Sequence, residues 1–124
     1  MDKAQALHSF WSSFGIPAYD ENTVDPDAKM PYITYEVSTG AIGAQIPLSA
    51  SIYYRSYSWA AIEQKAAEIA ARLGYSELTI PIDNGYVRLW NDHTNTFATR
   101  MSEPSDDGVR RIRLSLQAEF LTAY

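Results

Sequence analysis

Residues 58–74 constrain the fold most strongly, because they combine a regular apolar stripe with signals for both ends of a helix. Ser58 can cap the first turn by accepting a backbone N–H, and Gly74 supplies the left-handed residue that ends the helix. Such a stripe needs a surface to cover, and the sequence on both sides predicts strands, so we expect a sheet with this helix laid across it. The stripe recurs at spacings of three and four residues and consists of Trp59, Ile62, Ala66, Ile69 and Leu73.

The remaining sequence predicts one further helix and five strands. Helical spacing of apolar residues predicts a helix over residues 2–14, and polar composition predicts a loop at 19–29 and a turn-rich passage at 75–84. Residues 91–95 predict a turn from which the strand at 96–102 returns. The order α-β-β-α-β-β-β, with strands largely joined by hairpins, predicts an α+β fold in which helices pack on one face of a mainly antiparallel sheet. The strands are expected at residues 30–39, 47–57, 86–90, 96–102 and 109–121, the last being the longest alternating run.

Composition restricts the class of protein. The 124 residues contain no linker-like tract, which predicts one domain spanning 1–124. Ten basic and fifteen acidic residues give a net charge of −5, which argues against direct binding to nucleic acid. No secretory signal or membrane span is apparent, so we expect a soluble protein made inside the cell.

The search for reactive residues predicts neither an enzyme nor a metal or cofactor site. His8 and His93 lie far apart and lack a neighbour at a metal-ligand spacing. No nucleophile elbow or phosphate loop is present, and without cysteine there is no thiolate. The paired carboxylates occur beside Asn or Gly in expected turns, where Asp binds the local backbone. They are Asp83, Asp92, Asp106 and Asp107.

Several surface features predict contacts with other proteins instead. Residues 40–47 are expected to form a loop whose apolar side chains would be exposed to water. An apolar loop of this kind is typical of a contact with another subunit. Tyr32, Tyr53 and Tyr57 fall on the polar side of their strands, as half-buried sheet neighbours or as interface anchors. Arg111 and Arg113 share the polar face of the last strand, where they either pair with a strand carrying Glu36 or bind an acidic partner. The candidate contacts are Ala41, Ile42, Ala44, Ile46, Tyr53, Arg55, Arg111 and Arg113.

Four short segments together resemble the tail-terminator and tail-completion proteins of long-tailed bacteriophages. They are PYITYEV at 31–37, YRSYSWAAIEQKAAEIAARL at 54–73, the Asn84-Gly85 turn with VRLW at 87–90, and the closing VRRIRLSLQAEFLTAY. The resemblance covers the chain from about residue 30 to its end, and the family has no catalytic signature to transfer.

This resemblance implies a structural subunit of the virion neck, made in the cytoplasm of the bacterial host. Such subunits form a ring, typically a homo-hexamer, which caps the tail tube and joins it to the head-completion or connector protein. Two acidic loops are then candidates for the faces that meet tail tube or head. Their residues are Asp20, Glu21, Asp25 and Asp27 in the first loop, and Asp106 and Asp107 in the second.

Two other functions stay open at the level of sequence. One is another head-closure or minor tail component of a phage, which neighbouring genes would distinguish. The other is an unrelated small-molecule binding module or enzyme, which requires a concave pocket with convergent polar groups.

Overall fold

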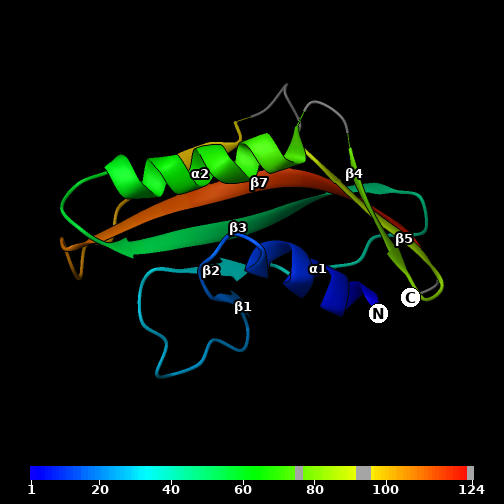
Figure 1. Ribbon diagram of the computed structural model, residues 1–124, viewed down its shortest axis with the longest axis horizontal. Helices are drawn as coiled ribbons and strands as arrows, with labels where there is room; N and C mark the ends of the chain where they lie inside the picture. Colours follow the sequence, from blue (N-terminus) through cyan, green and yellow to red (C-terminus); the bar gives the residue numbers. More distant parts are fainter. Residues whose placement is uncertain (75–76, 92–95, 123–124) are drawn as a thin grey trace.

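A computed structural model describes residues 1–74, 77–91 and 96–122 of the chain. The strands form a seven-stranded sheet in the order β1-β2-β3-β7-β5-β4, with β6 paired to β7 (Figure 1). The α+β class and the predicted order of elements are confirmed, with β1 and β4 as additional strands. The elements are α1 (Lys3–Ser12), β1 (Ala18–Asp20), β2 (Tyr32–Tyr35), β3 (Gln45–Arg55), α2 (Ala60–Leu73), β4 (Leu78–Ile82), β5 (Gly85–Trp90), β6 (Ala98–Met101) and β7 (Val109–Leu121).

Strand β7 is the centre of the sheet and has the predicted bounds. One of its edges pairs antiparallel with β3 along the whole of Gln45–Arg55. Its other edge is shared by β6 and β5, which pair with different stretches of β7. The predicted hairpin between the segments 86–90 and 96–102 is therefore wrong. The two strands pair with different stretches of the same edge of the 13-residue β7, and not with each other. Of the predicted turn at 91–95, residues 92–95, which include Asp92 and His93, lie outside the described residues.

Two strands form where the sequence predicted loops. Ala18–Asp20 pairs in parallel with β2, at the start of the expected loop 19–29. Leu78–Ile82 pairs antiparallel with β5, inside the expected turn-rich passage. Pro81 is compatible with this second strand because β4 lies at the edge of the sheet, where no partner needs its missing N–H.

The start of α1 and the end of α2 carry the residues expected there. Asp2 caps α1, accepting from the backbone N–H of Gln5 at 2.8 Å, while the Gln5 side chain accepts from the N–H of Asp2. At the start of α2 the N-cap position is held by Trp59 and has no side-chain capping bond, whereas the predicted cap Ser58 lies one residue earlier and its hydroxyl accepts from the N–H of Ala60 at 3.1 Å. Gly74 ends α2 with a positive φ of +65°, as predicted, although its ψ of −160° differs from that of the left-handed helical conformation.

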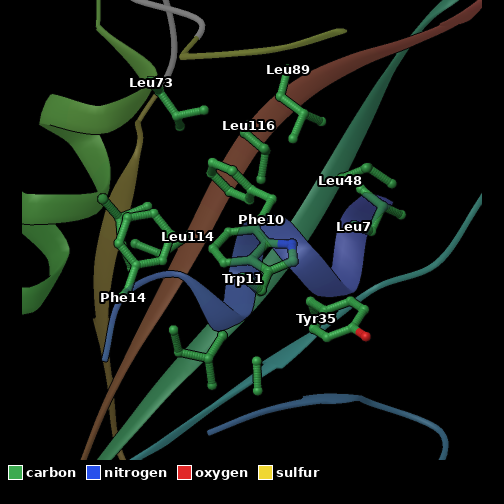
Figure 2. Packing of buried hydrophobic residues seen from close by; sticks show 14 of the residues in the cluster. Leu7, Phe10, Trp11, Phe14, Tyr35, Leu48, Leu73, Leu89, Leu114 and Leu116 are labelled. Atoms are coloured by element: carbon green, nitrogen blue, oxygen red, sulfur yellow. The ribbon is translucent and has the colours of Figure 1, made fainter. Parts of the chain in front are cut away.

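Both helices pack on the same face of the sheet and bury it. Figure 2 shows Phe10 and Trp11 of α1, and Phe14 just after the helix, beside Leu114 and Leu116 of β7. The rings of Phe10 and Trp11 meet edge to face, with centroids 4.9 Å apart. From α2 the residues of the predicted stripe that are buried are Ile62, Ala66, Ile69 and Leu73. Because both helices cover this one face, the opposite face of the sheet, called the open face below, carries no helix in the described part of the chain.

Candidate interface on the open face of the sheet

Strict alternation along β7 separates the core from the open face. Its core-facing residues are Ile112, Leu114, Leu116, Ala118 and Phe120, all buried. Its open-face residues are Arg111, Arg113, Ser115, Gln117 and Glu119, all at least partly exposed. The predicted orientation of this strand is therefore confirmed, and the two candidate arginines lie on the open face.

Three tyrosines and one arginine form a row across four strands of the open face. Tyr32 and Tyr53 are direct cross-strand partners, with ring centroids 5.2 Å apart. Tyr19 of β1 meets Tyr32 edge to face at 5.8 Å, and the Arg111 guanidinium lies 5.4 Å from the centroid of Tyr53. We call Tyr19, Tyr32 and Tyr53 the tyrosine row. Tyrosine and arginine are the residue types enriched at the energetic centres of protein interfaces.

Arg111 is held in place by its neighbours on both sides of the strand. Its Nε donates to the Ser51 hydroxyl at 3.2 Å, and its Nη1 lies 3.5 Å from a Glu103 carboxylate oxygen. The predicted pairing with Glu36 is wrong, because β3 lies between β2 and β7. Glu36 instead accepts from the backbone N–H of Ser49 at 2.9 Å.

The tyrosine row is partly withdrawn from water. Burial raises the pKa of the Tyr32 hydroxyl, and the nearby Tyr53, Glu103 and Tyr19 groups raise it further. This proximity places the Glu103 carboxylate beside the row as well as beside Arg111. The row thus presents three half-buried aromatic rings at the surface of the open face.

Arg113 is different from Arg111, because its side chain is exposed. Its neighbours in register are Ser51 on β3 and Thr99 on β6, both small. Within residues 1–74, 77–91 and 96–122, no carboxylate lies within ion-pair distance of Arg113.

The structure divides the apolar loop 40–47 into an exposed tip and a packed base. Ile42 is 68% exposed, Ala41 is exposed beside it, and Ala44 is half-buried. The N–H of Gly43 donates to the Phe120 carbonyl at 3.2 Å and so ties the loop to the end of β7. Ile46 belongs to β3 and packs against the core, so it is the least available of the four candidates.

The second acidic loop folds back onto the end of β3. Arg55 Nη1 lies 3.0 Å from Asp106 Oδ2, and the N–H of Gly108 donates to Asp106 Oδ1 at 2.9 Å. These contacts, chiefly the one from Arg55, lower the pKa of Asp106. Two candidates from separate predictions, Arg55 and Asp106, are therefore bound to each other, whereas Asp107 is exposed.

The first acidic loop keeps its carboxylates at the surface. Asp20 is half-buried in β1 and accepts from the N–H of Asn22, and Asp25 accepts from the N–H of Asp27, both at 2.9 Å. Glu21, Asp25 and Asp27 are exposed. Across the described residues, none of these four carboxylates takes part in an ion pair.

The histidine and aspartate residues considered for catalysis or metal binding make local contacts that account for their positions. His8 lies 3.1 Å from the Tyr35 hydroxyl and 3.3 Å from that of Ser12. Asp83 pairs with the terminal amine of Met1. Among the described residues, no group of His, Asp and Glu side chains gathers closely enough to hold a metal ion. None of the helices described is long and apolar enough to cross a membrane.

Two shallow hollows flank α2. One, of about 330 Å³, lies beside Trp59, whose ring is flanked by the Arg100 and Arg110 guanidinium groups at 4.6 and 5.3 Å. Arg100 also binds Glu63 at 2.7 Å, so these contacts tie α2 to β6 and β7. The other, of about 610 Å³, lies between Tyr54 and the outer side of α2.

No protein-family model and no curated protein matches the sequence. Among solved structures, the fold is similar to that of a chain in the virion of the native gene transfer agent (GTA) particle. The TM-score is 0.58 at 20% sequence identity, and the match covers 94% of this chain and 84% of that one. This likeness establishes a shared fold along nearly the whole of both chains.

Proposed function

We propose that the protein is a structural subunit of a phage-type virion, and that it forms a ring that caps the tail tube and joins it to the head-completion or connector protein. The shared fold with a chain of the gene transfer agent virion supports a place in a virion. The resemblance of residues 30–124 to tail-terminator proteins supports the neck position and a hexameric ring.

The observation that carries the proposal is the open face with its tyrosine row and Arg111. A sheet covered by helices on one side only leaves the other side available to a partner. Here that side bears rigid, half-buried aromatic rings and a fixed guanidinium, which suit a protein contact better than a catalytic one.

A ring needs two different patches, because each subunit meets its neighbours through unlike surfaces. The tip of loop 40–47 supplies a second patch distinct from the tyrosine row. Gln45, just after this tip, and Tyr53 lie eight residues apart on β3, a separation of about 27 Å at the usual rise of a strand. The two patches are therefore separate surfaces toward opposite ends of the strand, and a head-to-tail contact requires two such unlike patches.

Immunogold labelling of intact particles tests this function directly. An antibody against the protein should place gold at the junction of head and tail. Gold along the head surface or at the far end of the tail would refute the neck position, and absence of the protein from purified particles would refute a virion role.

A further inference from the structure

We propose that the open face around Arg113 binds the acidic loop 20–27 of a neighbouring copy of the chain. This inference rests on the proposed function, since its occupant is a second subunit of the ring. It assigns that loop to the contact between subunits rather than to tail tube or head.

The proposed binding surface presents the exposed guanidinium of Arg113 among small side chains. Arg113 projects from the centre of the sheet between Ser51 and Thr99, with Ser115 next along the same face. Small hydroxyl side chains let a loop approach the guanidinium closely, and a guanidinium favours paired hydrogen bonds to a carboxylate. Tyr53 and Arg111 lie on one side of this surface.

Charge complementarity indicates which segment binds the surface around Arg113. Most other acidic side chains of the described chain are already in ion pairs: Glu63 with Arg100, Glu68 with Lys65, Glu77 and Glu119 with Arg88, Asp83 with the Met1 amine, Glu103 with Arg111, and Asp106 with Arg55. In contrast, loop 20–27 gathers Glu21, Asp25 and Asp27, exposed and without an ion-pair partner among the described residues. An exposed cation and an exposed acidic loop on one chain match when two copies meet.

The geometry favours contact between copies over contact within one. Strands β2 and β3 lie between β1 and β7, so three strand spacings, about 14 Å, separate the β1 edge from Arg113. Figure 1 shows the loop extending beyond the β1 edge, away from β7. Because loop and face are different patches, the contact is heterologous and propagates from subunit to subunit, as a ring requires.

Charge reversal on each side, followed by their combination, tests the pairing. Arg113→Glu reverses the face. Glu21→Lys with Asp27→Lys reverses the charge at two exposed positions and takes the loop from −4 to neutral, while keeping the Asp20 and Asp25 side chains that accept from its backbone. Arg72→Glu, at an exposed arginine on α2, and Asp107→Lys, in the other acidic loop, are the matched controls. Light scattering after size exclusion gives the concentration at which half of each protein is assembled, and circular dichroism checks folding.

Each reversal should raise that concentration by about tenfold or more, and the combined variant should recover most of the loss. The controls should assemble like the wild type, whose assembly should weaken as salt is raised. Rings formed equally well by Arg113→Glu and by the loop variant would overturn this inference and leave the proposed function standing. A wild type that assembles neither alone nor on purified tail tubes would overturn both.

Discussion

Replacing Ile42 with aspartate should abolish ring assembly while leaving the subunit folded. The side chain lies at the tip of loop 40–47 and is 68% exposed, so the folded monomer loses little packing when it changes. Exposed substitutions of this kind usually alter the free energy of unfolding by no more than about 0.5 kcal/mol.

The expected effect on assembly is much larger than the effect on folding. Fully burying an isoleucine side chain contributes about 1.5–3 kcal/mol, and roughly two thirds of Ile42 remains to be buried by a neighbour. Each contact should therefore lose about 1–2 kcal/mol when Ile42 becomes alanine, a weakening of roughly 5- to 30-fold. Aspartate should weaken the contact further, because a carboxylate would have to leave water without a partner.

The assay compares the half-assembly concentrations of Ile42→Ala, Ile42→Asp and wild type by light scattering, with thermal unfolding as the check on folding. Ala4→Asp is the control, because it adds the same charge at an exposed position in the first turn of α1, where a negative charge is favourable. An Ile42→Asp protein that assembles like wild type would remove the loop tip from the interface.

Three further predictions concern the stability of the subunit. Leu116→Ala, in the middle of β7 and 1% exposed, should lower the free energy of unfolding by about 2–5 kcal/mol in a urea titration, and a loss below about 1 kcal/mol would contradict the packing described. Gly85→Ala should cost at least about 1–3 kcal/mol, because Gly85 has φ of +153° and an added Cβ would meet the Leu121 carbonyl oxygen; an unchanged melting temperature would refute this. Asp106 has a lowered pKa, so its stabilising contribution is complete above the ordinary carboxyl pKa and disappears as pH falls through the lowered value. Asp106→Asn should therefore reduce stability at neutral pH and flatten its pH dependence below about pH 4, and parallel stability curves for the two proteins would count against the Arg55 contact.

The long periodic elements could be predicted from sequence because their pattern is strong and local. Thirteen alternating residues fix β7, and the stripe with Ser58 and Gly74 fixes α2. The short strands depend on distant partners instead. The three residues Ala18–Asp20 form β1 because they pair in parallel with β2. In β4, Pro81 makes the sequence look like a turn although its side chains alternate.

The candidate interface was predictable in part for the same reason. Tyr53, Arg111 and Arg113 were identified because their strands alternate clearly, and the register then brings Tyr53 beside Arg111. Tyr19 was missed, since it lies in a strand that resembles a loop. The pairing of Arg55 with Asp106 joins residues 51 positions apart in the sequence, and no local pattern announces it.

The central claim is that copies of this chain form a closed ring, and the mass of the protein in solution tests it most directly. Light scattering after size exclusion, over a range of protein and salt concentrations, should give a species of about six chain masses, with negative-stain images showing a central hole. The same measurement is repeated with purified tail tubes, to detect a ring that forms only on the tube as its template. A protein that stays monomeric alone and does not bind the tube end would contradict the account.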